Sequence, residues 1–283
     1  MCGIVAYIGA KEPLPIVLDG LQRLEYRGYD SAGVFISDGT KQQITKVVGK
    51  VAALREALSE KEVLTSKLGM GHTRWATHGQ PAHENAHPHV SNSGDLVLIH
   101  NGIIENYDIL KKELQQRGYQ FQSETDSEVL INWIEEVQKT ENVKLGKAVQ
   151  LALNQVIGAY GIVVYDRLNP EELVVARLGS PIAIGLDKEG FFVGSDATPF
   201  LDHTREVIYL DDNELALLQP GKTIQVRKID DDSLQTPTVQ QLKWNLENIQ
   251  KGGFPHFMLK EIHEQPNALR DTLRGRLLAE EGK

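Results

Sequence analysis

The chain has 283 residues, of which 41% are hydrophobic and 24% are charged, a balance typical of folded globular proteins rather than disordered ones. Its 30 Lys and Arg residues against 39 Asp and Glu residues give a net charge of −9, which argues against broad binding to nucleic acid or anionic membranes but permits a local basic pocket. No run approaches the roughly 20 apolar residues of a membrane span, and no basic region precedes the apolar opening Gly3–Ile8, so we expect a cytoplasmic protein without a membrane partner.

Strand-like runs alternate with a few amphipathic helices, and most strands are separated by short turns that favour antiparallel pairing. Because each amphipathic helix must cover an apolar sheet face, we expect sheets with helices on their outer faces. In chain order, the predicted elements are the strand Gly3–Ile8, the helix Leu14–Leu24, the strands Gly33–Ser37, Gln43–Val48, Leu68–Thr73 and Leu96–His100, the helices Asp108–Arg117, Thr125–Val137 and Lys144–Val156, the strands Ile162–Tyr165, Leu173–Ala176, Phe191–Val193, Val207–Leu210, Leu215–Leu218 and Thr223–Val226, and a final helical segment around Leu259–Leu278.

The pattern breaks after the acidic run Asp230–Ser233, where Pro237 and the pair Gly252-Gly253 interrupt it. The final helical segment carries an apolar stripe, although Pro266 limits its continuity. Such a stripe needs a partner. We expect it to pack on a segment that follows Lys283, on another subunit or, as the simplest alternative, on its own domain.

Cys2 is the single cysteine, so the chain cannot form an internal disulfide. One cysteine also makes a structural zinc site a weak hypothesis, because such sites commonly use several. It follows only Met1, and removal of Met1 would leave a cysteine with a free α-amino group. The amine titrates at about 7.7–8.0 and a free thiol at about 8.5, so the amine could accept the thiol proton near neutral pH. Position alone thus allows two interpretations, an amino-terminal nucleophile or a small buried hydrophobic residue.

A second block, Gly71–Gly79, is typical of a strand that runs into a glycine-terminated loop. The planar guanidinium of Arg74 suits a carboxylate, and Thr77 and His78 can donate hydrogen bonds to the same anion. The alternative is a surface arginine paired with a nearby acid. Trp75 by itself is more typical of a core than of a ligand wall.

Six of the nine histidines fall between His72 and His100, which raises the question of a metal site. The histidines His83, His87 and His89 lie in a proline-containing loop without a clear set of carboxylate or thiolate ligands. We therefore expect them to form hydrogen bonds that structure the loop, and we predict no metal.

Asn101 and Gly102 follow a strand, and as sequence alone this pair predicts a turn. The functional alternative is a pair of donors, because the Asn101 amide and the Gly102 backbone N–H can converge on a developing oxyanion. Asp126 belongs to the capping box Thr125–Glu128, where a negative charge favours the start of a helix. Its carboxylate could instead bind a substrate ammonium, and the local sequence leaves both roles open.

Seven blocks of the chain form one specific combination. They are Met1–Val5, Leu24–Gly33, His72–Gly79, Asn85–His89, His100–Tyr107, Ser123–Glu128 and Met258–Pro266. Together they resemble the class II glutamine amidotransferases, whose glutaminase domains belong to the N-terminal-nucleophile hydrolases. The block Leu24–Gly33 is similar to the glucosamine-6-phosphate synthase branch of that family rather than to the phosphoribosyl amidotransferase branch.

The resemblance covers essentially the whole chain but only the glutaminase half of such an enzyme. It implies an α+β fold, a four-layer αββα sandwich of two mainly antiparallel sheets between helical layers. Residues 1–240 would form the class II glutamine amidotransferase domain, and residues 241–283 a linker and the start of a missing sugar-isomerase half.

The resemblance also implies roles in an attack on the side-chain amide of L-glutamine. Cys2 would supply the thiol, with its own amine as general base, while Asn101 and Gly102 would form the oxyanion hole. Arg27 and Gly28 would position the cysteine and its amine.

The remaining roles concern recognition of the amino acid. The substrate α-ammonium would bind Asp126. The α-carboxylate would bind Arg74, Thr77, His78 and the backbone of Trp75. Opposite charges at the two ends of the amino acid would explain how one amide is chosen among many.

The implied reaction releases ammonia and then glutamate through a γ-glutamyl thioester, without a metal or organic cofactor. In the full-length enzyme, expected to be a homo-oligomer, the ammonia would reach fructose 6-phosphate through the isomerase half and yield glucosamine 6-phosphate. Two alternatives remain: a glutaminase domain that serves another acceptor such as phosphoribosyl pyrophosphate, and a non-catalytic amino-acid-binding or regulatory module.

Overall fold

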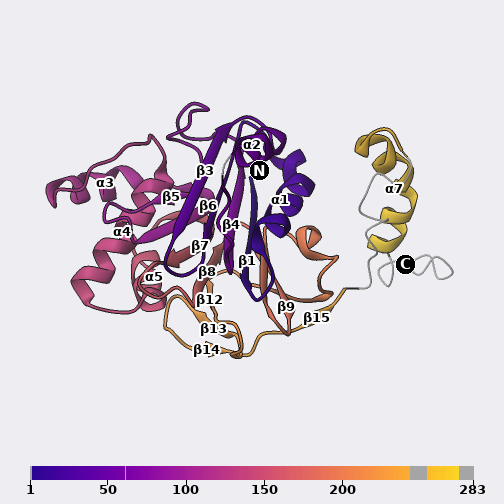
Figure 1. The fold of residues 1–283 in the computed structure, drawn as a ribbon. Coiled ribbons are helices and arrows are strands. Elements are labelled where there is room, and N and C mark those ends of the chain that lie inside the picture. Colours follow the sequence, from indigo (N-terminus) through magenta and orange to yellow (C-terminus); the bar gives the residue numbers. More distant parts are fainter. Residues whose placement is uncertain (1, 61, 243–253, 274–283) are drawn as a thin grey trace. The chain divides into compact units, whose positions relative to one another are not determined.

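A computed structural model describes residues 2–60, 62–242 and 254–273 (Figure 1). Contacts within the chain divide it into two compact units, residues 1–242 and 243–283. The described part of the second unit contains the helix α7 (Phe257–Leu273), which includes Pro266. Met1 and the predicted end of the last helix, residues 274–278, lie outside the described residues.

The first unit is built on two antiparallel sheets. Within the described residues, one sheet has eight strands in the order β15-β11-β9-β10-β1-β4-β2-β3, and the other has seven in the order β14-β13-β12-β8-β7-β6-β5. The first sheet contains β1 (Gly3–Gly9), β2 (Ser31–Ser37), β3 (Gln42–Val48), β4 (Leu68–Arg74), β9 (Ala183–Asp187), β10 (Gly190–Gly194), β11 (Glu206–Tyr209) and β15 (Gln240–Gln241). The second contains β5 (His89–Val90), β6 (Leu96–Ile104), β7 (Gly158–Asp166), β8 (Leu173–Leu178), β12 (Glu214–Leu218), β13 (Gln225–Lys228) and β14 (Leu234–Gln235).

Helices cover the outer face of each sheet, as Figure 1 shows. Because strand side chains alternate between faces, Ile4 and Ile8 of β1 pack toward the second sheet while Val5 packs against α1 and α2. This order of helix, sheet, sheet and helix confirms the predicted αββα sandwich. The helices are α1 (Pro13–Leu24), η1 (Glu25–Arg27), α2 (Val51–Ser59), α3 (Tyr107–Gln116), α4 (Asp126–Glu141), α5 (Leu145–Leu153) and η2 (Thr198–Phe200). In the described part of the chain, no helix combines the length and apolar character needed to cross a membrane.

The strand β1 lies inside the first sheet, with β4 on one side and β10 on the other. Gly3 pairs with Thr73 of β4, and Val5 pairs with Gly194 of β10. All seven residues of β1 are buried. Cys2 therefore stands at the end of an interior strand, between two neighbours that restrict where its side chain can lie.

The predicted turn at Asn101 and Gly102 is wrong, because β6 continues through both residues to Ile104 and pairs with β7. Gly102 has a φ of 139°, and a Cβ at this position would lie 2.0 Å from the carbonyl oxygen of Ala159. Glycine is thus required here because two paired strands approach closely, and not because the chain reverses direction.

Several observed elements have no predicted counterpart, including the helix α2 and the strand β9. In α2, Val51, Leu54 and Leu58 are spaced at helical intervals and buried, but the helix is only nine residues long. Every predicted strand and helix overlaps an observed element among the described residues. The errors therefore concern short elements and ends, which carry the weakest periodic signal.

Candidate active site

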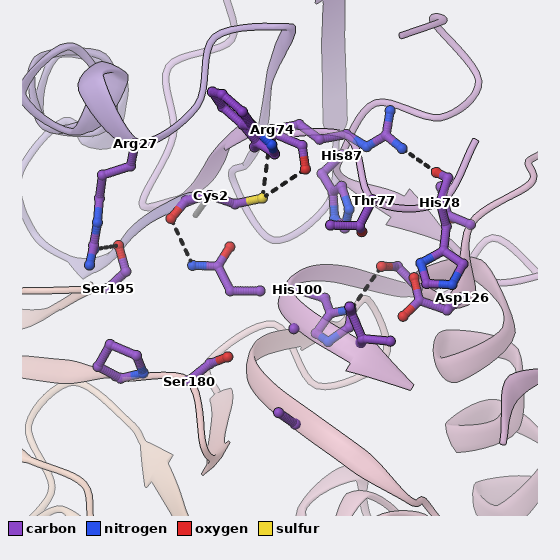
Figure 2. A pocket seen from close by; sticks show the side chains of 18 of the residues that line it. Cys2, Arg27, Arg74, Thr77, His78, His87, His100, Asp126, Ser180 and Ser195 are labelled. Carbon is purple, nitrogen blue, oxygen red and sulfur yellow. Dashed lines mark hydrogen bonds between the residues drawn. The ribbon is translucent and has the colours of Figure 1, made fainter. Parts of the chain in front are cut away.

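A cavity of about 430 Å³ lies where the ends of β1, β4 and β6 meet the start of α4 (Figure 2). Nine of the ten predicted site residues line it, and Gly28 lies behind it. The lining residues are Cys2, Arg27, Arg74, Trp75, Thr77, His78, His87, His100, Asn101, Gly102, Ile103, Glu105, Thr125, Asp126, Ser127, Ala159, Ser180, Pro181 and Ser195.

The Cys2 thiol contacts the backbone of Trp75. The Trp75 N–H donates to Sγ at 3.2 Å, and the thiol lies 3.6 Å from the Trp75 carbonyl oxygen, to which it can donate. Burial raises the pKa of the Cys2 thiol, and the hydrogen bond from Trp75 acts in the opposite direction. The thiol therefore needs a nearby base to become a thiolate at neutral pH.

Gly28 supports the peptide unit that faces the thiol. A Cβ on Gly28 would lie 2.9 Å from the carbonyl carbon of Arg74 and 3.0 Å from the nitrogen of Trp75. The same segment is held by Asp30, whose N–H donates to the Arg74 carbonyl at 3.1 Å and whose carboxylate accepts from the Ala76 N–H. The absence of a side chain at Gly28 thus lets the chain approach closely enough to fix the Trp75 amide.

Arg27 is linked through Ser195 to the strand that follows Cys2. Its Nη1 donates to Ser195 Oγ at 2.9 Å and lies 3.3 Å from the Asp196 carboxylate. Ser195 Oγ also accepts from the N–H of Ile4, two residues after Cys2, at 3.3 Å. This linkage anchors the start of β1, and Ser195 was missed because a single serine after a strand carries no recognisable signal.

Asn101 and Gly102 lie on β6, directly across from the cysteine. Asn101 Nδ2 donates to the carbonyl oxygen of Cys2 at 3.1 Å. The same nitrogen carries a second N–H that can donate to another acceptor. The structure therefore brings the predicted oxyanion donors to the predicted nucleophile, even though the predicted turn is absent.

Arg74 is buried, and its guanidinium structures the loop that follows β4. Nη2 donates to the carbonyls of His78 and Gly79, and Nη1 donates to that of Gln80 at 3.3 Å. An arginine has five N–H donors, so these three bonds leave capacity for a carboxylate. The predicted alternative of a surface arginine paired with an acid does not fit this buried position.

Asp126 is the first residue of α4, and both roles predicted for it fit its position. Thr125 Oγ1 caps the helix by accepting from the N–H of Glu128 at 3.3 Å. Asp126 is only 3% exposed, and its Oδ2 accepts from the N–H of Ile104 at 2.8 Å. Its carboxylate also lines the cavity, with His78 and Thr77 close by in Figure 2.

Four buried histidines lie at the cavity and form what we call the imidazole cluster: His72, His87, His89 and His100. His87 and His100 line the cavity. His72 and His87 stack with ring centroids 4.1 Å apart, and His89 meets His87 edge-on at 4.6 Å. Burial lowers the pKa of every member, that of His72 to about 3, so the rings are neutral.

His83, the remaining loop histidine, is exposed and lies outside the cluster. His89 Nε2 bonds to Thr125 Oγ1 at 3.1 Å, and His100 Nδ1 bonds to Ser127 Oγ at 2.8 Å. Among the residues that the structure describes, no group of three or more His, Cys, Asp and Glu side chains is arranged to hold a metal ion.

A family model described as a glutamine amidotransferase domain matches residues 40–228 of the chain. The chain is 50% identical over 281 residues to glutamine–fructose-6-phosphate aminotransferase (isomerizing) of Bacteroides thetaiotaomicron, covering 99% of this chain and 45% of that protein. It is 46% identical over 282 residues to the enzyme of the same name from Thermus thermophilus, covering 100% of this chain and 46% of that protein. The chain thus spans less than half the length of these curated relatives.

The fold is similar to that of glutamine phosphoribosylpyrophosphate amidotransferase from B. subtilis, solved in complex with ADP and GMP. The TM-score is 0.69 and the identity 26%, over 81% of this chain and 50% of that one. A glutamine aminotransferase class-II domain protein from Silicibacter pomeroyi gives a TM-score of 0.54 at 14% identity, over 80% of this chain and 99% of that one, which is a likeness of fold alone.

Proposed function

The chain belongs to the family of glutamine amidotransferase domains, and from that premise we propose that its cavity hydrolyses the side-chain amide of L-glutamine by way of a thioester on Cys2. One observation carries the proposal: Cys2 Sγ, held by the Trp75 amide, lies beside an Asn101 nitrogen that can donate to a developing oxyanion. A nucleophile next to an oxyanion donor is the arrangement that acyl transfer requires.

The chemistry begins once Met1 has been removed, because the α-amine of Cys2 is then free to act as the base. The amine takes the thiol proton, and Sγ bonds to the amide carbon of glutamine. Asn101 Nδ2–H and the Gly102 N–H donate to the resulting oxyanion. The C–N bond then breaks, the amine returns its proton to the leaving nitrogen, and ammonia departs. The same amine then takes a proton from water, and the water oxygen bonds to the thioester carbon. The C–S bond breaks, glutamate leaves, and Cys2 Sγ takes the proton back from the amine.

Recognition of glutamine uses its two charged ends. We assign the α-carboxylate to Arg74, Thr77, His78 and the backbone of Trp75, and the α-ammonium to Asp126. Support comes from the burial of Arg74 and Asp126, since charge-assisted hydrogen bonds are strongest where water is excluded.

The fate of the ammonia depends on the rest of the protein. The similar chains named glutamine–fructose-6-phosphate aminotransferase are more than twice as long as the part that this chain covers. We propose that residues 1–240 form the glutaminase domain and residues 241–283 lead into a sugar-isomerase half. Ammonia would there reach fructose 6-phosphate and give glucosamine 6-phosphate, in a cytoplasmic homo-oligomer. Phosphoribosyl pyrophosphate is a weaker candidate acceptor, because the likeness to that enzyme rests on 26% identity.

The test is the intact mass of the purified protein before and after treatment with 6-diazo-5-oxo-L-norleucine, an electrophilic glutamine analogue, followed by peptide mapping. We expect loss of Met1 and one adduct on Cys2 that excess glutamine prevents. A protein that lacks Met1 but never labels would instead favour an amino-acid-binding module without turnover.

A further inference from the structure

His72 connects the two sheets at the active site. It lies on β4 of the first sheet, is 1% exposed, and pairs in register with Ile4 of β1. Its Nε2 lies 3.0 Å from Asn101 Oδ1 and 3.0 Å from the carbonyl oxygen of His100, both on β6 of the second sheet. The mechanism above gives this ring no part, although it touches the residue that would donate to the oxyanion.

The neighbours of the ring determine its tautomer. A backbone carbonyl can only accept, so the short contact with the His100 oxygen requires a proton on Nε2 of His72. The ring is neutral because burial lowers its pKa to about 3, so Nδ1 carries no proton. Nδ1 has no hydrogen-bond partner among the described residues, as expected of an unprotonated nitrogen in a ring that stacks on His87.

This tautomer in turn fixes the amide of Asn101. The side-chain atom that faces Nε2–H must be an acceptor, which places Oδ1 toward His72 and Nδ2 toward the cysteine. The carbonyl of Cys2 favours the same orientation from the other side, since it too can only accept. A flipped amide would set oxygen against oxygen at Cys2 and N–H against N–H at His72.

We propose that His72 is a positioning residue for glutamine hydrolysis, which orients the Asn101 amide through its Nε2–H so that the amide nitrogen faces the nucleophile. The inference rests on the proposed function, because the orientation matters only if an oxyanion forms beside Cys2. His72 itself contacts no reacting atom.

The test compares two substitutions of similar size. In His72→Gln an amide N–H can reach about the position of Nε2, whereas in His72→Asn it reaches only about that of Nδ1. Since loss of one oxyanion donor lowers kcat by about 10²–10³-fold, we expect His72→Asn to lower kcat for glutamine by about 100-fold and His72→Gln to stay within about fivefold. KM should stay within about threefold in both. His203→Asn, on an exposed histidine that stacks on Phe192 and does not line the cavity, controls for loss of a stacked imidazole elsewhere in the fold.

Equal losses of kcat in the two variants, or a change in KM alone, would overturn the proposal, because a ring that serves only for packing is not rescued by a donor at one position. A second measurement does not depend on the variants folding. In the unmodified chain, ¹⁵N NMR of the His72 ring should show the neutral form protonated at Nε2, and a ring protonated at Nδ1 alone refutes the orientation. If the unmodified chain releases no glutamate, the proposed function fails, while the NMR result still decides the tautomer.

Discussion

Cys2 and Asn101 face each other across the cavity, yet they are held in different ways. Cys2 is placed by backbone groups, since its thiol contacts the Trp75 peptide, and that peptide rests on Gly28. Asn101 depends on a side chain as well, because its Oδ1 accepts from His72 of the imidazole cluster while its Nδ2 donates to the Cys2 carbonyl. We call the side of the cavity with Cys2 and Trp75 the first wall, and the side with Asn101 and Asp126 the second wall. Activity should therefore be sensitive to added side-chain volume at the first wall, and to lost hydrogen bonds and altered charge at the second.

The largest effect tests the thiol itself. Cys2→Ala should lower the rate of glutamate release by about 10⁴-fold or more, because the nucleophile is gone, while Arg74 and Asp126, the proposed binding groups for the two ends of glutamine, remain. Glutamate release and glutamine binding by calorimetry check this. Unchanged turnover would show that chemistry does not depend on the first wall.

The next effect tests the backbone contact. Gly28→Ala should lower kcat by about 100-fold, because the new Cβ meets the Arg74–Trp75 peptide and moves the amide that holds the thiol. The control is Gly94→Ala, where φ is 83° and a Cβ meets no atom within 4 Å. That variant should lose stability and keep its kcat. If both variants lose activity equally, general destabilisation explains the result.

A smaller effect is expected at Asp126 of the second wall, where a substitution should change KM for glutamine and leave kcat almost unchanged. Asp126→Asn should raise KM for glutamine by about 30-fold through loss of a charge-assisted bond to the ammonium, with kcat within about threefold. The amide can still accept from the Ile104 N–H, so the fold should persist. Asp108→Asn, an exposed acid in the first turn of α3, is the matched control and should leave KM unchanged.

The smallest predicted effect is the loss of folding stability in acid that each histidine of the imidazole cluster contributes. Each cluster histidine has a lowered pKa when folded and an ordinary value of about 6.5 when unfolded, so the unfolded chain binds more protons below pH 6.5. Stability should therefore fall with falling pH, by about 1.4 kcal/mol per pH unit for each histidine, until the folded form also titrates, at about pH 3 for His72.

Urea unfolding at several pH values measures that slope. His89→Gln should reduce it by about one proton, whereas substitution of the exposed His83 should leave it unchanged. A slope that is equal in all three proteins would mean that the cluster does not couple acid to unfolding.

On both walls, the sequence predicts some features of the site and not others. Local pattern made Arg74 and Asp126 candidates, the family resemblance implied their roles, and both line one cavity. The turn predicted at Gly102 failed because the local preference of an Asn-Gly pair was overridden by strand pairing with residues around Ala159. Ser195 and the linkage of His72 to Asn101 depend on contacts between distant strands, and no local spacing encodes them.

The place of β1 in its sheet has a consequence for the order of events during synthesis. Gly3 pairs with Thr73, which leaves the ribosome early, whereas Val5 pairs with Gly194. At about 5–20 residues per second, the second partner follows the first by roughly 6–25 s. During that interval one edge of β1 has no partner strand, and the segment that follows Cys2 is paired with β4 alone. The strand that bears the nucleophile therefore gains its second partner only once synthesis has passed Gly194.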